Sequence, residues 1–208
     1  MNLKTFFSKQ ARNPSGRFGR WVMSKIFDHG NAAINDFMKE QVLLQENDHV
    51  LEIGFGTGKL IFEMAKQMNK GLIEGIDLSD TMVAIAEKKN NNYIAEGKVI
   101  IRHGNFEETA YNDNHFDKIF SANTIYFWPQ PDNFIKTILR ILKPGGKLIL
   151  AFVDKAQLES RPLDTNVFHL YHRDEIIELL SCSGFSGSID MISKEIKSQR
   201  YHCAVAVK

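Results

Sequence analysis

Glycines and acidic residues fall together at two points of the chain, in a pattern suited to holding a nucleoside. Residues 52–58 read EIGFGTG, and Asp77 lies 23 residues beyond Gly54. Gly54, Gly56 and Gly58 permit a tight turn and let a ligand lie directly against the backbone. A carboxylate at Asp77 can accept hydrogen bonds from both hydroxyl groups of a ribose. The two motifs therefore predict a site for a ribose-containing cofactor.

Two known nucleotide-binding fingerprints compete for the glycine-rich segment, and the sequence departs from both. The dinucleotide fingerprint G-x-G-x-x-G requires glycine at position 59, where the chain has Lys59. The phosphate-binding loop G-x-x-x-x-G-K-[ST] requires glycine at 53 and a hydroxyl residue at 60, but these are Ile53 and Leu60. A nicotinamide-dependent oxidoreductase is therefore disfavoured. A tight turn without a ligand remains the alternative to a cofactor site.

Alternating strands and helices must position these residues, and the hydrophobic pattern predicts such an arrangement. Strand–helix–strand spacing of about 20 to 30 residues implies parallel strands with right-handed crossovers, whose ligands bind beyond the carboxyl ends of the strands. Apolar runs predict parallel strands over residues 49–53, 72–76, 99–101, 116–122 and 147–153, and alternating patterns predict an antiparallel pair over 188–196 and 201–207.

Helical spacing of apolar residues predicts the intervening helices. Asn31 is the expected N-cap of a helix that runs to about Glu46, and Ser79 or Asp80 is the expected cap of a later one. We assign the end of the helix over residues 134–142 to Pro144 and a left-handed glycine that follows it. The other predicted helices cover residues 60–68 and 175–181.

Composition indicates an ordinary globular protein. The chain has 208 residues, of which 43% are hydrophobic and 25% charged, and we expect one domain over residues 1–208. The longest strongly apolar run, residues 148–153, is far shorter than the roughly 20 residues that span a bilayer. The chain start shows no signal-peptide pattern, and two cysteines make no disulfide framework. We expect a cytoplasmic protein without a membrane span.

Residues 1–30 form a basic arm with bulky apolar side chains. The arm has six Lys or Arg residues against Asp28, 6 − 1 = +5, whereas the other residues sum to 20 − 24 = −4. We predict a lid over the site, with Gly16 and Gly19 as flexible joints and Arg17 or Arg20 meeting a carboxylate. A solvated helix face is the alternative, and a basic arm can also meet nucleic acid or an acidic membrane surface.

Three motifs, taken in order, make the sequence resemble the class I S-adenosylmethionine-dependent methyltransferases. They are residues 50–58, 75–79 and 142–148, and the resemblance extends over about 48–208. The most similar branch is the small, single-domain one that includes the quinone-biosynthesis C-methyltransferases. The resemblance implies an α/β, doubly wound, seven-stranded and mostly parallel sheet, with an antiparallel last strand and helices on both faces. It implies S-adenosyl-L-methionine as cofactor and S-adenosyl-L-homocysteine as product.

The resemblance also assigns cofactor contacts. Gly54, Gly56 and Gly58 match the turn under the methionine portion and the adenosine, and Asp77 matches the ribose-binding acid. An amide replaces the acid of the family's Gly-Asp-x loop, which weakens that contact with the adenine. The remaining contacts are Glu52 at the loop or the cofactor's amino group, Leu78 beside the adenine, Asn105 and Phe106 in the Gly-Asp-x loop, and Asn123 near the methionine portion.

Aromatic residues directly after the fourth strand predict the acceptor side. Tyr126 and Trp128 can stack on a planar acceptor or face a sulfonium cation, with core packing as the alternative, above all for Phe127. Arg20 completes the expected substrate contacts. No catalytic residue is identified. His169, Tyr171 and His172 are candidate bases, and a helix cap or a surface position is the favoured alternative for them. No metal site is expected, because His103 and His115 have no acid or cysteine at ligand spacing.

The leading functional hypothesis is methyl transfer to a small-molecule acceptor by in-line displacement. A first alternative is methylation of RNA or another macromolecule that docks on the basic arm. The segment from Asn123 to Tyr126 lacks the Asn/Asp-Pro-Pro-Tyr motif of enzymes that methylate exocyclic amino groups of bases, which argues against that acceptor. A second alternative is a module that binds the cofactor without turnover.

Overall fold

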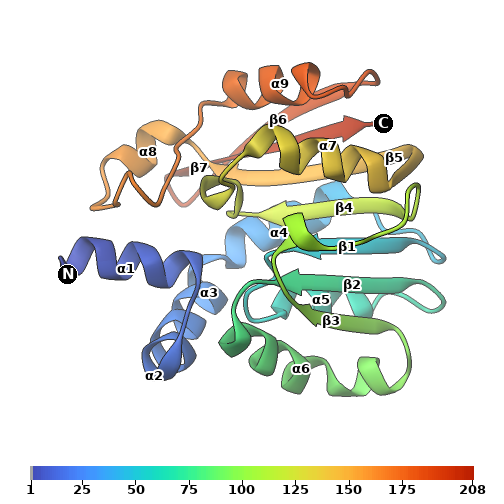
Figure 1. The fold of residues 1–208 in the computed structure, drawn as a ribbon, viewed down its shortest axis with the longest axis horizontal. Helices are drawn as coiled ribbons and strands as arrows, with labels where there is room; N and C mark the ends of the chain where they lie inside the picture. The colour runs from blue at the N-terminus through green and yellow to red at the C-terminus, as the bar shows by residue number, and fades with distance from the viewer. Residues whose placement is uncertain (1) are drawn as a thin grey trace.

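Seven strands of residues 2–208, the part of the chain that the structure describes, form one sheet through the centre of the molecule (Figure 1). The structure is a computed structural model. The strand order is β3-β2-β1-β4-β5-β7-β6, and β7 runs in the direction opposite to the other six strands. The strands are β1 (His49–Ile53), β2 (Leu72–Asp77), β3 (Val99–His103), β4 (Phe116–Ala122), β5 (Leu142–Val153), β6 (Ile189–Ile196) and β7 (Gln199–Val207).

Helices cover both faces of this sheet, which confirms the predicted doubly wound fold. The helices α4 and α5 lie behind the sheet in Figure 1, with α6 against α5, and α7 lies in front of it with α9 alongside. Their bounds are α4 (Ala32–Val42), α5 (Lys59–Ala65), α6 (Asp80–Ala95), α7 (Pro131–Ile141), α8 (Lys155–Glu159) and α9 (Arg173–Cys182), with 3₁₀ turns η2 (Phe106–Glu108) and η3 (Ile125–Phe127). Apolar side chains of the central strands, such as Leu51, Ile119 and Ile149, are fully buried between the sheet and the helices.

The N-terminal arm is helical and lies beside the carboxyl ends of β1, β2 and β4, at the left of Figure 1. Gly19 is not the flexible joint that the sequence suggests. It has helical dihedral angles, and an added Cβ would lie 2.7 Å from the carbonyl carbon of Pro14, so glycine is needed there for close packing. The arm consists of α1 (Leu3–Arg12), α2 (Gly16–Phe18), the π-helical turn η1 (Gly19–Met23) and α3 (Ser24–Gly30).

The first helix after the arm is shorter than predicted. It ends at Val42 because Leu43 adopts a left-handed conformation with φ 45°, and the Leu43 carbonyl accepts a hydrogen bond from Lys118 Nζ at 3.0 Å. Asn31 does not cap this helix with its side chain as expected. Its amide oxygen instead accepts a hydrogen bond from Asn123 Nδ2 at 3.1 Å.

The predicted glycine cap after α7 is wrong. Helix α7 ends at Ile141, and Leu142 is already extended and paired with Phe116 on β4. The next pair in register is Lys118 with Lys147, so the intervening residues bulge out of β5. Gly145 takes its positive φ of 75° inside this bulge. None of the helices in residues 2–208 combines the length and apolar composition needed to cross a membrane.

Candidate active site

A cavity of about 630 Å³ opens at the carboxyl ends of the strands, under the N-terminal arm. It brings together most of the residues that the sequence singled out. Those that line it are Glu52, Gly54, Gly56, Asp77, Leu78, Asn105, Phe106, Asn123, Tyr126 and Trp128. Gly58 and Arg20 belong to the predicted set but are not part of the lining.

The three glycines of the first turn all require a left-handed backbone, with φ values of 74°, 55° and 67° at Gly54, Gly56 and Gly58. Gly54 donates its N–H to the Ile76 carbonyl at 2.8 Å, and any Cβ there would clash with the Thr124 methyl. At Gly58 a Cβ would lie 2.7 Å from the Cβ of Ala86. Gly58 therefore serves the packing of α5 on α6, whereas Gly54 and Gly56 face the cavity.

Asp77, at the end of β2, is hydrogen-bonded to the glycine turn that follows β1. Its Oδ2 accepts the Gly56 N–H at 2.8 Å, and its Oδ1 accepts the Ser79 N–H at 2.9 Å. Burial raises the pKa of the Asp77 carboxyl to about 6, although these two hydrogen bonds act in the opposite direction. Ser79, whose hydroxyl accepts the Met82 N–H, caps α6. Asp77 is therefore free of the capping role and lines the cavity.

Glu52 is a buried acid with an unused oxygen. Only 3% of the residue is exposed, and Oε2 has no hydrogen-bond partner among residues 2–208. Burial, and then the charge of nearby Asp77, raise the pKa of Glu52 well above its ordinary value. A buried carboxyl without a partner is costly, and an ammonium group placed in the cavity would provide the missing donor.

In the loop after β3, the side chain of Asn105 already makes hydrogen bonds within the loop. Asn105 Oδ1 accepts the Glu107 N–H at 3.3 Å, and its Nδ2 donates to Glu108 Oε1 at 3.1 Å. Asn105 therefore caps the short turn η2, which occupies part of its hydrogen-bonding capacity. Leu78 is 39% exposed beside this loop, and Phe106 is buried. Both line the cavity with apolar surface.

Tyr126 and Trp128 line the cavity from within the core. The Tyr126 hydroxyl accepts the Val153 N–H at 2.6 Å, and burial raises the pKa of Tyr126 above its ordinary range. The Trp128 ring stacks on Phe134 with centroids 4.4 Å apart and 12° between the planes. Phe127, which the sequence favoured as a core residue, is less buried than either of these two.

The arm brings Arg12, rather than Arg20, to the cavity. Thr5 donates to Asp164 Oδ2 at 2.5 Å, and Ser8 accepts the Asp164 N–H at 2.9 Å. Arg12 follows Ser8 by one helical turn and lies on the same face of α1. Arg161, from the loop after α8, also lines the cavity. His169, Tyr171 and His172, the candidate bases, are not part of the lining.

Contacts from the arm also hold the glycine turn. Asp28 accepts a hydrogen bond from Thr57 Oγ1 at 2.5 Å and an ion pair from Lys89 at 3.3 Å. Ser79 Oγ donates to the Pro14 carbonyl at 2.5 Å, and the Phe27 ring lies 3.4 Å from the position of a Cβ on Gly56. The arm therefore covers the cavity at the carboxyl ends of β1 and β2.

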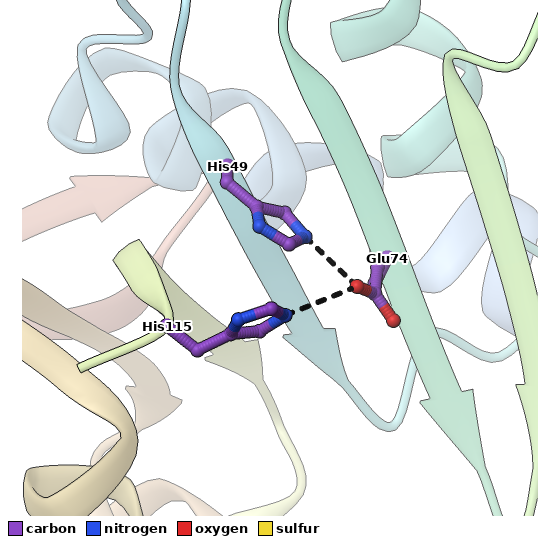
Figure 2. A group of neighbouring side chains, drawn as sticks. All are labelled: His49, Glu74 and His115. Carbon is purple, nitrogen blue, oxygen red and sulfur yellow. Dashed lines mark hydrogen bonds and ion pairs between the residues drawn. The ribbon is translucent and has the colours of Figure 1, made fainter. Parts of the chain in front are cut away.

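A second polar cluster lies at the opposite end of the strands (Figure 2). Glu74 Oε1 is 2.8 Å from His49 Nε2 and 3.8 Å from His115 Nε2, and Arg102 Nε binds Glu74 Oε2 at 2.9 Å. The potential ligand atoms of the two histidines and Glu74 lie within 4.8 Å of one another. Sequence spacing did not reveal this cluster, because its residues come from β1, β2 and the turn before β4. Arg102 already neutralises the carboxylate, and the absence of a metal site remains a prediction.

A doubly wound sheet, a glycine turn after β1 and a carboxylate at the end of β2 together define a protein that binds a nucleoside cofactor. Comparison with known proteins narrows the class. The family model for the methyltransferase domain matches residues 51–150. The chain is 29% identical over 178 residues to the uncharacterized methyltransferase YdaC of Bacillus subtilis, covering 86% of this chain and 93% of that one. It is 30% identical over 132 residues to YrhH of the same organism, which is named as a methyltransferase, covering 64% and 68%.

Further similarity extends to a named enzyme and to a solved structure. The chain is 33% identical over 109 residues to the ubiquinone/menaquinone biosynthesis C-methyltransferase UbiE of Shewanella sediminis, covering 52% of this chain and 43% of that one. An S-adenosylmethionine-dependent methyltransferase from Aquifex aeolicus has the same fold, with a TM-score of 0.72 at 22% identity, covering 89% and 96%. The chain belongs to the class I S-adenosylmethionine-dependent methyltransferases, and S-adenosyl-L-methionine is its cofactor.

Proposed function

We propose that the protein transfers the methyl group of S-adenosylmethionine to a small organic molecule bound in the arm-side half of the cavity. The observation that carries this proposal is the extension of the cavity beyond the two strand ends. Its volume of about 630 Å³ is in the range of small-molecule sites. The cavity lining contains many apolar side chains besides those at the strand ends, including Met23, Phe27, Phe127, Leu163, Phe168 and Tyr201.

The residues at the strand ends fit the cofactor. We assign the ribose hydroxyls to Asp77, whose two oxygens each accept only one backbone hydrogen bond. The unpartnered Glu52 Oε2 suits the ammonium group of the methionine portion, and Gly54 and Gly56 leave room beside the backbone. When bound, S-adenosylmethionine supplies a sulfonium-activated methyl group for an in-line displacement.

The chain itself has to align the acceptor and keep water out. Alignment of two reactants can supply roughly 7–11 kcal/mol of a barrier. The arm closes one side of the chamber, and Phe127 packs against Phe168 on the other with ring centroids 4.6 Å apart. Arg12 and Arg161 line the same cavity and offer positive charge to an anionic acceptor group. The raised pKa of Tyr126 keeps its hydroxyl protonated, so this residue positions neighbouring groups rather than accepting a proton.

The names of relatives support a small acceptor. UbiE is named for ubiquinone and menaquinone biosynthesis, and other similar proteins are named demethylmenaquinone methyltransferases. A small, mostly apolar acceptor is consistent with the apolar walls of the chamber.

The test is transfer of labelled methyl groups from S-adenosylmethionine into a cell extract, separated into small-molecule, lipid, nucleic-acid and protein fractions. We expect label in the small-molecule or lipid fraction with the wild-type chain, and none above background with Asp77→Ala. Label that depends on the wild-type chain but appears in nucleic acid or protein would overturn the small-molecule proposal.

A further inference from the structure

Large apolar side chains are concentrated on the outer surface of the N-terminal arm. Of the seven that are exposed in residues 2–208, five belong to the arm, which is about one seventh of the chain. Leu43 and Leu78 are the two others. The five in the arm, with their exposed fractions, are Leu3 (70%), Phe7 (41%), Trp21 (63%), Val22 (39%) and Ile26 (47%).

These side chains lie on two helical segments that contact each other. Leu3 and Phe7 are one turn apart on α1, and Val22 and Ile26 are one turn apart on the following helical segments. The two halves meet where the rings of Phe7 and Phe18 pack with centroids 5.3 Å apart. We call this set, with Phe18 and Trp21 included, the apolar ridge.

Positive charge flanks the apolar ridge without a compensating acid on the outer surface. Asp28, the arm's one acidic residue, is turned inward, where it contacts Thr57 and Lys89. The arm's basic side chains are therefore exposed next to exposed apolar surface, and Arg12 also lines the cavity. The six basic side chains are Lys4, Lys9, Arg12, Arg17, Arg20 and Lys25, and all are exposed.

We propose that the arm docks this protein on the surface of an anionic lipid bilayer. An amphipathic helical segment with bulky apolar residues and flanking Lys and Arg side chains lies in the interface, with its apolar side chains at the boundary between headgroups and acyl chains. A polynucleotide would satisfy the basic residues but not the exposed Leu3 and Trp21. A second copy of this chain would bring an equal positive charge against the first, which disfavours a dimer through this face.

Docking would place the mouth of the cavity against the lipid. Ile26 belongs to the apolar ridge and also lines the cavity, as does Arg12 from α1. An apolar acceptor dissolved in the bilayer would then reach the chamber without crossing water. This consequence rests on the proposed function, whereas docking itself does not.

The direct test is flotation of the full chain with vesicles. We expect the protein to float with vesicles of phosphatidylcholine and phosphatidylglycerol, and to remain in solution with vesicles of phosphatidylcholine alone. Trp21→Ser should weaken binding to the anionic vesicles by about tenfold, a loss that corresponds to about 1.4 kcal/mol. Leu43→Ser is the matched control, because Leu43 is equally exposed at 62% but lies outside the arm. It should float as the wild type does.

Two double variants with reversed charges test the electrostatic contribution to lipid docking. Arg17→Glu with Lys25→Glu should abolish flotation, whereas Lys88→Glu with Lys136→Glu, two exposed lysines on α6 and α7, should reduce it far less. Binding of S-adenosylhomocysteine should be unchanged in every variant, which separates a failure of docking from a failure of the proposed function or of folding. Absence of flotation by the wild type would overturn the proposal. Equal flotation by Trp21→Ser, or a lipid-free dimer that Trp21→Ser dissociates, would also overturn it.

Discussion

Two acids at the cavity, Glu52 and Asp77, are buried with very different surroundings. Asp77 receives two backbone N–H groups, whereas Glu52 Oε2 receives no hydrogen bond from residues 2–208. Asp77 can therefore be ionised while the cavity is free of ligand. Glu52 has a strongly raised pKa, and it gains a partner when a cationic group enters. The two acids should accordingly respond differently to substitution.

At Glu52 we predict that Glu52→Gln leaves the ligand-free protein at least as stable as the wild type. The amide has nearly the same shape and cannot carry a buried charge. The increase in melting temperature caused by S-adenosylhomocysteine should shrink, because the amide no longer attracts an ammonium group. Thermal unfolding with and without the ligand measures both quantities. A large loss of stability without ligand would show that Glu52 has a structural role instead.

At Asp77 we predict that the affinity for S-adenosylhomocysteine falls as pH drops through about 6. Burial raises the pKa of this carboxyl to about 6, and only the ionised form accepts hydrogen bonds from both ribose hydroxyls. The same raised pKa makes the ligand-free protein gain stability as pH falls from 6 toward 4, so the two trends oppose each other. Calorimetric titrations at several pH values measure the affinity. In Asp77→Asn this step should be absent; an unchanged step would assign it to another group.

The glycines of the cofactor side could be found in the sequence because they act through the backbone. A left-handed turn after a buried strand demands glycine, and residues 52–58 show this demand without any knowledge of the fold. Arg12 and Arg161 could not be found in this way. They reach the cavity only because α1 packs on the loop around Asp164 through Thr5 and Ser8.

At the scale of elements, the turn between β1 and α5 is held by contacts from other segments. Gly54 is packed against Thr124, which lies after β4, and the Phe27 ring of the arm lies next to Gly56. The turn is therefore a point where three parts of the chain meet.

We predict that Gly54→Ala costs about 2–4 kcal/mol of unfolding free energy, from a strained positive φ together with overpacking on Thr124. Gly97→Ala is the matched control, because Gly97 also has a positive φ of 71° but nothing within 4 Å of the added Cβ. It should cost only about 1 kcal/mol. Urea unfolding measures both variants. Equal losses would mean that the contact with Thr124 does not matter.

The bounds of helices and strands could be predicted where neighbouring residues determine them. They could not be predicted where contacts with distant parts of the chain determine them. The expected bounds of the strands at residues 49–53 and 116–122 are those observed. Helix α4 stops early because Lys118 on β4 binds the Leu43 carbonyl, a contact 75 residues away along the chain. The start of β5 at Leu142 depends on pairing with Phe116, which overrides the helix-stop pattern that follows it.

At the scale of the whole molecule, the sheet separates two polar sites. The cavity lies at the carboxyl ends of the strands, and the cluster around Glu74 lies toward their other ends (Figure 2). Burial raises the pKa of Glu74, but bonds from His49 and Arg102 outweigh this and lower it below its usual 4.5. Burial and the nearby His49 also lower the pKa of His115 below its usual 6.5. Both groups therefore link folding to pH.

We predict that His115 and Glu74 each contribute a loss of unfolding free energy on acidification, and that these losses oppose the gain from Asp77 between its usual pKa of 3.8 and about 6. The unfolded chain takes up a proton at His115 near pH 6.5, before the folded chain does, so stability is lost as pH falls below that value. The lowered pKa of Glu74 gives a second loss as pH falls below 4.5. Urea unfolding of the wild type and Glu74→Gln from about pH 8 to about pH 3 measures both. Glu74→Gln should lack the second loss; a second loss that persists would contradict the assignment.

The central claim is that a cofactor sits at the ends of β1 and β2 with its ribose on Asp77. Calorimetric titration with S-adenosylhomocysteine at neutral pH tests it most directly, using wild type, Asp77→Ala and Asp80→Ala. Asp80 is an exposed acid three residues away, so its variant controls for a general loss of charge. We predict affinity about 10- to 100-fold weaker for Asp77→Ala and unchanged for Asp80→Ala. Equal binding by Asp77→Ala and the wild type would contradict the account.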